Sequence, residues 1–387
     1  MTVLWQPTLD ESAARWQALA ERLGRERFAP LAPELDRDQR YPWETIEALV
    51  EHRFVGLFLP RQWGGEGASL VATVAAVETL GTHCASTAAI MCAYQLGAFP
   101  ILLAGTDAQK DFYLREMTQG RATSFALSER IAGSDAAAIE ATAVREGDGW
   151  RLRGEKYWIG NGGASRYYVV FAKTDPAQAG RGISAFMVDK EQPGAVVDEL
   201  SDKMGIRGTQ TSNLKVDLVV PDSARIGELH RALRLALQTL NVGRIMVSAQ
   251  SMGLAIAAYR EAARRAVERR TFGQPIGENQ GIGFMLADMA TRISAARMML
   301  YEAARAYDRG DDVSNLGAMA KLFTSEVAHQ AADDAVQIWG GLGYCKPTVV
   351  ERLYRDQRIL EIYEGSSEIQ RLVLSRAIRK EAETPAA

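Results

Sequence analysis

Glu146-Gly147-Asp148-Gly149-Trp150-Arg151-Leu152-Arg153 joins a turn signal to a β-prone run in the middle of a chain whose pattern is otherwise helical. Glycine and aspartate favour tight turns, and short β-prone runs between such turns are typical of strands. Further runs of this kind occupy residues 167–171, 183–188 and 214–220. We therefore expect a compact antiparallel sheet domain, a barrel or a sandwich, over residues 121–225.

Helical spacing of apolar residues occupies both sides of this segment. Residues 71–80 and 87–96 are expected to form two buried helices within an N-terminal α-helical domain, residues 1–120. The proline-free run 233–270 carries apolar residues on more than one face, which is typical of a long buried helix. With further helices expected at residues 278–309, 314–338, 349–360 and from 367, residues 226–387 form a C-terminal α-helical domain. The fold class is therefore α+β with three domains, and no G-x-G-x-x-G loop or βαβ unit is present.

The composition is that of an ordinary globular protein, with 387 residues, 47% hydrophobic and 24% charged residues, and a net charge of −3. Lys and Arg are scattered, so no nucleic-acid partner is expected. Cys84, Cys92 and Cys345 have no metal-ligand spacing and are too few for a disulfide scaffold. We expect no metal, reduced thiols and a cytoplasmic location.

Two segments bear on targeting and membranes. Residues 1–10 lack a basic region followed by an apolar run, so no signal peptide is expected. Residues 88–105 carry no charge, and the length of this uncharged run approaches that of a membrane span. Because Gly97 and Pro100 interrupt this run, we expect a buried helix followed by a bend at Pro100. Only the tail after Glu381 is expected to be disordered.

Tyr363-Glu364-Gly365 places a carboxylate between an aromatic ring and a glycine, just before an expected helix. Gly365 permits a backbone bend, and Ser366 is a good N-cap. Glu364 therefore projects from the end of an element. In isolation, the pattern favours an acidic residue that stabilises a helix N-terminus over a catalytic carboxylate.

Four other segments have both a functional and a structural interpretation. Residues 125–135 could hydrogen-bond a planar heterocycle or form a turn, and Trp158 could stack on a flat cofactor or cap the core. The arginines of residues 268–275 could hold a pyrophosphate or complement a helix dipole. The glycines of residues 340–343 could allow close approach of a ligand or end a helix.

Taken together and in this order, these segments resemble the acyl-CoA dehydrogenase family over essentially the whole chain. The resemblance rests on Leu127-Ser128-Glu129 with Gly133-Ser134-Asp135, Trp158-Ile159 with Asn161-Gly162, residues 203–207, residues 268–273, Gln280, residues 287–289, Gln337 with residues 340–343, Arg355-Asp356, and residues 363–365 with 369–371. It implies a C-terminal four-helix bundle and a non-covalent FAD between the β domain and the C-terminal helices.

The resemblance also implies a mechanism. Glu364 matches the carboxylate that removes the thioester α-proton while a hydride leaves the β-carbon for flavin N5. The backbone N–H of Glu364 and a flavin hydroxyl would stabilise the thioester oxygen. A second branch carries its base just before the arginine that matches Arg244, but that position here is Gly243. Glu364 is thus the expected base.

Binding residues follow from the same matches. Around the flavin ring the resemblance places Phe125, Leu127, Ser128, Trp158, Ile159 and Gly160, with Ser134 near the cofactor or the thioester and Ser366 and Glu368 near the cofactor. On the ADP half of a neighbouring subunit's FAD it places Arg269, Phe272, Gln280, Gln337, Gly340 and Gly341. Expected substrate contacts are Ser134, Asn241, Arg244, Tyr363 and Gly365.

Three positions depart from the family's pattern. Gly160 stands where Thr or Ser is usual, which removes a hydroxyl expected near flavin N5. Arg130 stands where proline is usual, and residues 227–237 lack the usual glycine-rich opening of the long helix. Loss of one hydrogen-bond donor would raise the free-energy barrier to hydride transfer by an amount on the order of 1 kcal/mol, which slows the step without abolishing it.

Three hypotheses for function follow. The leading one is α,β-dehydrogenation of an acyl-CoA to a trans-2-enoyl-CoA by a homotetramer, a dimer of dimers, with an electron-transfer flavoprotein as acceptor. The second keeps the fold but acts on an acyl-carrier-protein substrate, or uses oxygen as a flavin oxidase or monooxygenase. The third is a non-catalytic scaffold that binds FAD or acyl-CoA. The uncharged residues 88–99 favour an apolar acyl tail.

Overall fold

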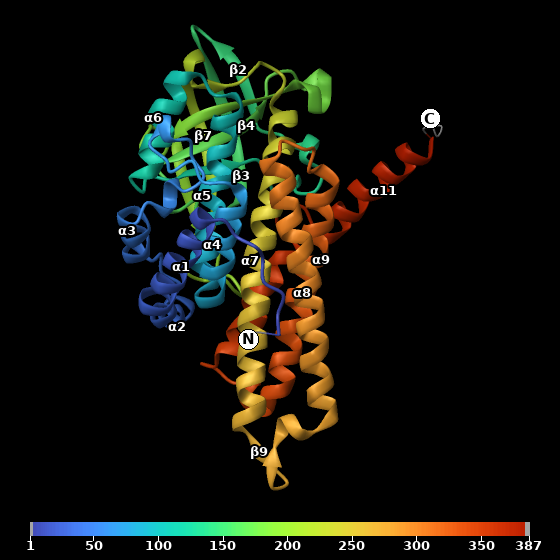
Figure 1. Ribbon diagram of the computed structural model, residues 1–387. Coiled ribbons are helices and arrows are strands. Elements are labelled where there is room, and N and C mark those ends of the chain that lie inside the picture. The colour runs from blue at the N-terminus through green and yellow to red at the C-terminus, as the bar shows by residue number, and fades with distance from the viewer. Residues whose placement is uncertain (1–2, 384–387) are drawn as a thin grey trace.

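The computed structural model describes residues 3–383 and begins with a layer of helices. These are α1 (Glu11–Leu23), α2 (Ala29–Asp38), α3 (Trp43–Glu51), α4 (Leu70–His83), α5 (Ala85–Ala104) and α6 (Asp107–Thr118). The two buried helices expected here are confirmed as α4 and α5, although both are longer than predicted. Figure 1 shows them beside the long helices of the C-terminal half.

An eight-stranded sheet follows, with the order β6-β7-β3-β2-β4-β5-β8 and with β1 paired to β4. Its strands are β1 (Thr123–Ala126), β2 (Thr142–Glu146), β3 (Gly149–Ile159), β4 (Tyr167–Lys173), β5 (Ile183–Asp189), β6 (Ala195–Leu200), β7 (Ser212–Pro221) and β8 (Arg225–Ile226). The predicted turn is confirmed, because Glu146 pairs with Gly149 across a tight hairpin. The sheet is not purely antiparallel, since β1 runs parallel to β4.

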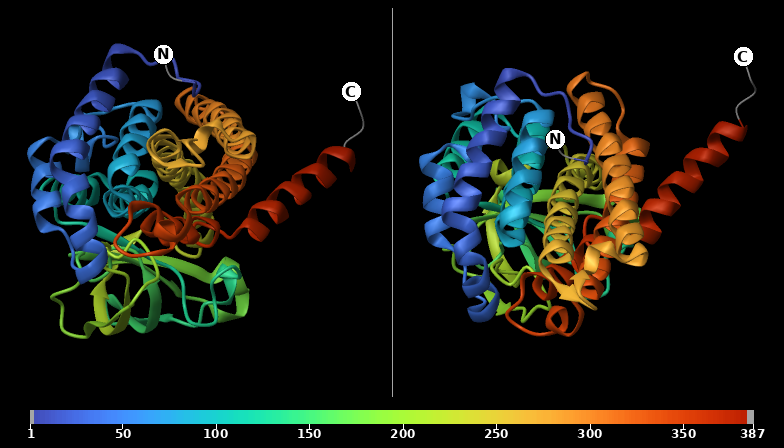
Figure 2. Two further views of the ribbon diagram at one scale, coloured as in Figure 1. Left: turned by 90° about the horizontal axis from the view of Figure 1, so that it is seen from below. Right: turned by 60° about the horizontal axis from the view of Figure 1, so that its bottom comes forward.

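The C-terminal half is dominated by three long helices, α7 (Ala232–Glu268), α8 (Gln280–Asp308) and α9 (Ser314–Trp339). A small hairpin, β9 (Arg270–Thr271) with β10 (Gln274–Pro275), joins α7 to α8 at one end of the bundle (Figure 1). The remaining helices are α10 (Val349–Gln357) and α11 (Ser367–Glu383), which projects from the body in Figure 2. The predicted order of a helical, a β and a helical segment is confirmed.

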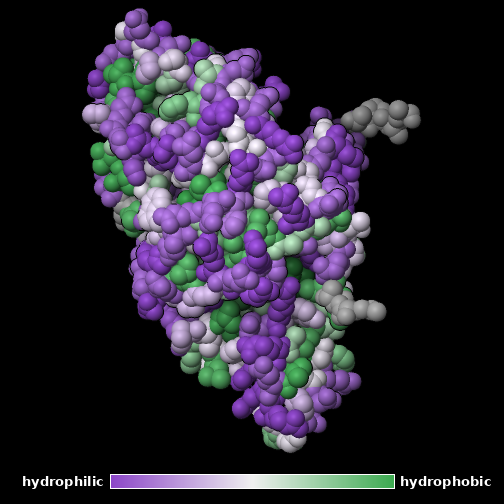
Figure 3. Space-filling model, turned by 60° about the vertical axis from the view of Figure 1, so that its left-hand side comes forward, coloured by the Kyte–Doolittle hydropathy of each residue, from purple (hydrophilic) through white to green (hydrophobic). Residues whose placement is uncertain are grey.

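Figure 2 also shows the sheet packed against one side of the helices. One apolar core runs through the N-terminal helices, the long C-terminal helices and the facing side of the sheet, and a second core fills the sheet itself. Figure 3 shows hydrophobic residues interspersed with hydrophilic ones over the face in view, as on ordinary globular surfaces.

The bend predicted at Pro100 is wrong, because α5 continues through Pro100 to Ala104. Proline removes one helical hydrogen bond, and burial of the surrounding residues outweighs that cost. Gly97 allows α5 to touch β1, since a Cβ there would lie 1.8 Å from the Thr123 carbonyl oxygen. By length and hydropathy α5 could cross a bilayer, yet 72% of its apolar window is buried inside the protein.

The prediction of a disordered tail falls partly outside the described residues. Helix α11 extends to Glu383, two residues beyond Glu381, and residues 384–387 are not described. Of the N-terminal stretch examined for a signal peptide, residues 1–2 also lie outside the described part.

Candidate active site

Glu364 sits in a tight turn between the short 3-10 helix Arg358–Glu361 and α11. Its φ is 56° and that of Gly365 is 86°, so two consecutive residues adopt left-handed backbone conformations. For a glutamate this conformation is uncommon and costs energy, which points to a constrained position. The predicted cap is present, because Ser366 Oγ accepts a 3.5 Å hydrogen bond from the Ile369 N–H.

The carboxylate of Glu364 points back into the protein rather than into solvent. Its Oε2 atom is buried and has no hydrogen-bond partner within residues 3–383. This oxygen lies against α7 at Gly243, where an added Cβ would stand only 2.6 Å from it. The side chain of Leu96, on α5, lies 3.4 Å from the same point. Gly243 therefore makes room for the carboxylate.

Burial raises the pKa of Glu364 to about 7, against the opposing effect of the Arg244 and Lys321 cations. Arg244 is itself buried, which lowers its pKa, and the Glu364 carboxylate opposes that shift. A carboxylate with a pKa near neutrality can accept a proton at physiological pH and release it again. The site thus has the electrostatics of a general base.

Arg244 and Asn241 lie together beside this carboxylate, one turn apart on α7. Arg244 Nη1 donates to Asn241 Oδ1 at 3.0 Å, and Asn241 Nδ2 donates to Ser314 Oγ at 2.9 Å. Of the five predicted substrate-binding residues, the structure brings Arg244 close enough for its charge to act on Glu364, and Asn241 is hydrogen-bonded to Arg244. Their contact with a substrate stays a prediction.

Neutral side chains complete the surroundings of the carboxylate. The Tyr363 hydroxyl donates to Gln250 Oε1 at 2.5 Å, and the Cys92 thiol donates to the Met246 carbonyl at 3.5 Å. Burial, and next the charge of Glu364, raise the pKa of the Cys92 thiol. Tyr363 and Cys92 therefore remain protonated, and they add no competing charge.

One face of α5 connects the base to the end of β3. Ala93 lies 3.8 Å from the point that a Cβ on Gly160 would occupy, and Leu96 lies near Gly243 and Glu364. Ala93, Leu96 and Glu364 are partly exposed, and Gly160 is exposed. Helix α5 therefore places Ala93 beside the strand end and Leu96 beside the base.

The predicted flavin residues of the sheet lie around that strand end. Trp158 has a φ of 56° and is 57% exposed, so its ring is presented outward. Ile159 is buried in the sheet core, which leaves only its backbone for a ligand. Gly160 has no side chain, and its carbonyl accepts a 2.8 Å hydrogen bond from Ser124 Oγ.

The segment Phe125–Ser128 runs beside β3. Phe125 packs on Phe171 with ring centroids 4.8 Å apart and remains partly exposed. The Leu127 carbonyl accepts from the buried Lys156 ammonium at 3.1 Å, and the Ser128 carbonyl accepts from the Tyr157 N–H at 2.9 Å. These contacts fix the backbone of the segment. Ser134 is exposed in the following loop.

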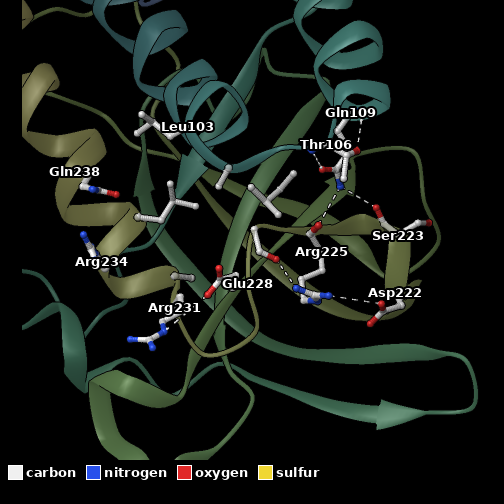
Figure 4. A pocket seen from close by; sticks show the side chains of 15 residues that line it. Leu103, Thr106, Gln109, Asp222, Ser223, Arg225, Glu228, Arg231, Arg234 and Gln238 are labelled. Carbon is white, nitrogen blue, oxygen red and sulfur yellow. Dashed lines mark hydrogen bonds and ion pairs between the residues drawn. The ribbon is translucent and has the colours of Figure 1, made fainter. Parts of the chain in front are cut away.

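A cavity of about 780 Å³ lies elsewhere, between the ends of α5 and β7 and the first turns of α7 (Figure 4). Its wall includes Gly227, Glu228, Arg231 and Arg234, from the segment that departs from the family's pattern. Glu364, Tyr363 and Arg244 do not line it. The residues that line this cavity include no buried carboxylate comparable to Glu364.

Comparison with known proteins identifies the family. Models of the N-terminal, middle and C-terminal domains of acyl-CoA dehydrogenases match residues 10–121, 124–219 and 231–379. An acyl-CoA dehydrogenase of Bacillus subtilis (strain 168) is 41% identical over 355 residues, which cover 91% of this chain and 94% of the relative. The chain belongs to the acyl-CoA dehydrogenase family.

Two solved structures of similar proteins agree with this assignment. Butyryl-CoA dehydrogenase from Megasphaera elsdenii is 36% identical, with a TM-score of 0.94 over 97% of this chain and 100% of that one. A chain in the structure of the electron transferring flavoprotein of Acidaminococcus fermentans is 38% identical, with a TM-score of 0.94 over 97% of this chain and 99% of that one. The predictions of fold class, of an oxidoreductase that dehydrogenates acyl thioesters and of FAD as cofactor are confirmed.

The residues at the strand end fit the flavin of an acyl-CoA dehydrogenase. The outward ring of Trp158 offers an aromatic surface, and the open position at Gly160 leaves space in front of α5. Two further predicted cofactor residues, Ser366 and Glu368, lie at the start of α11, and Glu368 is exposed. Their individual contacts stay predictions.

The other predicted cofactor residues lie far from Glu364 within one chain. Helix α7 ends at Glu268, about 38 Å along its axis from Gly243 at about 1.5 Å per residue. At or near that end lie Arg269, Phe272, Gln280, Gln337, Gly340 and Gly341, and Phe272 is 101% exposed. The fold therefore does not place these six residues near Glu364 of the same chain.

Sequence reasoning missed four side chains that surround the base. Lys321, Gln370, Gln250 and Cys92 come from α9, α11, α7 and α5. Gln370 lies in the motif of residues 369–371 and Cys92 in the uncharged residues 88–99, but no role was predicted for either side chain. Lys321 and Gln250 lie within helical patterns that predict only burial. Their proximity to Glu364 is a property of the packing of the helices.

Proposed function

We propose that the protein oxidises acyl-CoA thioesters with apolar acyl tails to trans-2-enoyl-CoA, with Glu364 as the base that removes the α-proton. The observation that carries this assignment is the buried Oε2 of Glu364, which has no hydrogen-bond partner in the described part of the chain. A buried polar atom without a partner is costly and calls for a functional explanation. A substrate α-carbon facing this oxygen provides one.

The chemistry demands more than a base. An α-proton beside a thioester is far less acidic than a carboxylic acid, and each unit of pKa mismatch costs about 1.4 kcal/mol. A pKa of about 7 reduces that mismatch relative to an ordinary glutamate. The backbone N–H of Glu364, directed by the left-handed turn, is the proposed donor to the thioester oxygen. When bound, FAD supplies the acceptor for the hydride that leaves the β-carbon.

The surroundings of the base favour an apolar acyl group. Leu96, Ala93 and the protonated Cys92 present no charge on this face of α5. The buried Arg244, anchored to Asn241, is the proposed contact for the CoA portion. Similarity to a butyryl-CoA dehydrogenase supports a CoA thioester over a carrier-protein substrate. An electron-transfer flavoprotein is the proposed acceptor, supported by the similarity to a chain in such a structure.

The test is anaerobic bleaching of the FAD-loaded protein. We expect butyryl-CoA or a branched acyl-CoA to reduce the flavin, and Glu364→Gln to abolish reduction while FAD stays bound. A panel of linear, branched and dicarboxylic thioesters, each offered on CoA and on a carrier protein, then defines the substrate. Normal bleaching of Glu364→Gln would show that the base is another group.

We propose a homotetramer, a dimer of dimers, in which the far end of one bundle completes the cofactor site of its neighbour. The fully exposed Phe272 and its distance from Glu364 in the same chain support this arrangement. Mass measurement in solution should give four chains, and Phe272→Ser should lower FAD retention. A monomer that retains FAD would contradict it.

Two further expectations remain proposals. We propose the domain boundaries 1–120, 121–225 and 226–387. The first falls in the connection between α6 and β1, and the second falls within the two-residue strand β8, just before the connection to α7. We also propose a cytoplasmic location, which the three unpaired cysteines support. Limited proteolysis and cell fractionation test these statements.

A further inference from the structure

Lys321 is a buried lysine whose ammonium reaches the turn that carries the base. It lies on α9 with 0% exposure, and its Nζ donates to the Gly365 carbonyl oxygen at 2.8 Å. A buried ammonium is costly unless it is hydrogen-bonded and faces a negative charge. One carbonyl does not supply that charge, so a nearby carboxylate must.

The charged groups around Lys321 identify Glu364 as that carboxylate. Burial lowers the pKa of Lys321 to about 8, and the strongest opposing effect is the charge of Glu364. Other titratable groups that face this ammonium or the Glu364 carboxylate are Glu361, Glu368, Arg244, Tyr363 and Cys92. Glu361 already accepts from Arg358, and Glu368 is exposed at the start of α11. Lys321 and Arg244 are therefore the two buried cations that act on the base.

A second, uncharged side chain holds the same turn. Gln370 Nε2 donates to the Gly365 carbonyl at 2.8 Å and to the Glu364 carbonyl at 3.1 Å. The left-handed conformation of Glu364 is uncommon, so these bonds to its flanking carbonyls stabilise a turn that would otherwise relax. Lys321 and Gln370 share this role, but only Lys321 adds a positive charge. The two residues form a matched pair for experiment.

We propose that Lys321 is a positioning residue for the Glu364 base, because its ammonium fixes the Glu364–Gly365 turn and supplies positive charge that keeps the buried carboxylate ionised. This inference rests on the proposed role of Glu364. Lys321 bonds the backbone of the turn, whereas Cys92 and Leu96 approach the carboxylate from α5. It therefore acts through Glu364.

The experiment compares Lys321→Met, Lys321→Arg and Gln370→Met. Anaerobic flavin reduction by butyryl-CoA is followed from about pH 5 to about pH 9, across the range in which Glu364 titrates. Removal of the ammonium should move the midpoint of the pH profile upward by about one unit or more. At pH values below that midpoint the rate should fall about tenfold, and it should recover at high pH. Lys321→Arg should restore the native midpoint.

Gln370→Met is the control for loss of a turn hydrogen bond without loss of charge. We expect it to lower the rate at every pH and to leave the midpoint unchanged. If Lys321→Met behaves in the same way, Lys321 is only a structural support and the proposal is wrong. Should Lys321→Met fail to fold, Lys321→Gln, which keeps a donor but not the charge, must show the raised midpoint.

An infrared titration gives a readout that does not depend on turnover. The protonated-carboxyl band that disappears in Glu364→Gln reports the ionisation of this side chain directly, and Lys321→Met should shift its midpoint upward. An unshifted band would overturn the proposal for Lys321. Normal flavin reduction by Glu364→Gln would instead overturn the base assignment, so the two failures are distinguishable.

Discussion

The carboxylate of Glu364 lies directly against the backbone of Gly243, so that a Cβ on Gly243 would stand 2.6 Å from Oε2. The two residues are far apart in sequence, and neither belongs to the other's element. By the resemblance described above, Gly243 also matches the position at which a second branch of the family carries its base. A side chain at this position and an inward Glu364 are therefore mutually exclusive without movement.

Gly243→Ala should displace the Glu364 carboxylate and slow flavin reduction while the fold survives. The clash falls on the flexible end of a side chain, and alanine favours a helix interior, so we expect little loss of stability. A misplacement of about 1 Å can cost about 100-fold in rate. Stopped-flow measurement of flavin reduction tests the expected loss of rate, and thermal unfolding tests the expected retention of stability. A native rate in this variant would show that the carboxylate does not react from the observed position.

The rate of flavin reduction should depend on pH through Glu364. Because burial raises the pKa of this carboxyl to about 7, the base is ionised above that pH and protonated below it. We expect the rate to rise through a midpoint near pH 7 and to fall about tenfold per unit on the acidic side. Single-turnover rates over the same pH range give the midpoint. A midpoint close to that of an ordinary glutamate would mean that the carboxylate is solvated.

Gly160→Thr should fit the structure and accelerate hydride transfer. The nearest side-chain atom to an added Cβ is Ala93 Cβ at 3.8 Å, which is ordinary contact, and the φ of Gly160 is not left-handed. A regained hydroxyl donor is worth on the order of 1 kcal/mol, or about fivefold in rate. Gly160→Val, of the same shape without the hydroxyl, is the control. Equal rates in the two variants would exclude a hydroxyl effect.

Arg297→Met should destabilise the protein strongly. Arg297 and Glu78 form a buried ion pair between α8 and α4, with Nη2 to Oε1 at 2.7 Å and Nε to Oε2 at 3.0 Å. Removal of one partner leaves a buried unpaired charge at a cost of about 3–5 kcal/mol. Urea unfolding measures the loss. The double variant with Glu78→Leu should recover most of it, and failure to recover would assign the loss to packing.

Much of the fold was predictable because its signals are local. The turn at Glu146–Gly149 and the strands on either side follow from neighbouring residues, and so does the long helix α7. The error at Pro100 has the opposite origin, because burial of α5 against α7 and β1 overrides a local helix-breaking signal. The parallel pairing of β1 with β4 joins segments about 40 residues apart, which strand patterns do not specify.

Some residues of the candidate site were likewise predictable from local motifs, whereas others were identified only by tertiary contacts. Glu364, Arg244 and Trp158 are identified by motifs, and Gly243 by its place before Arg244. Lys321 and Cys92 carry no motif, and Gln370 lies in the motif of residues 369–371 without a predicted role. The proximity of these three side chains to the base depends on contacts made from three different helices. The direction of the pKa shift of Glu364 is likewise decided by the structure, in which burial raises this pKa against the opposing charges of Arg244 and Lys321.

The sequence by itself determined the order of helical and β segments, the family and the carboxylate proposed as the base, because the spacing of apolar residues and short motifs are properties of neighbouring residues. Only the tertiary structure decided that this carboxylate is buried, that its Oε2 has no hydrogen-bond partner within residues 3–383, and that two cations flank it. Desolvation and charge act through space over a few ångströms, and α5, α7 and α9 reach that distance only after the chain has folded.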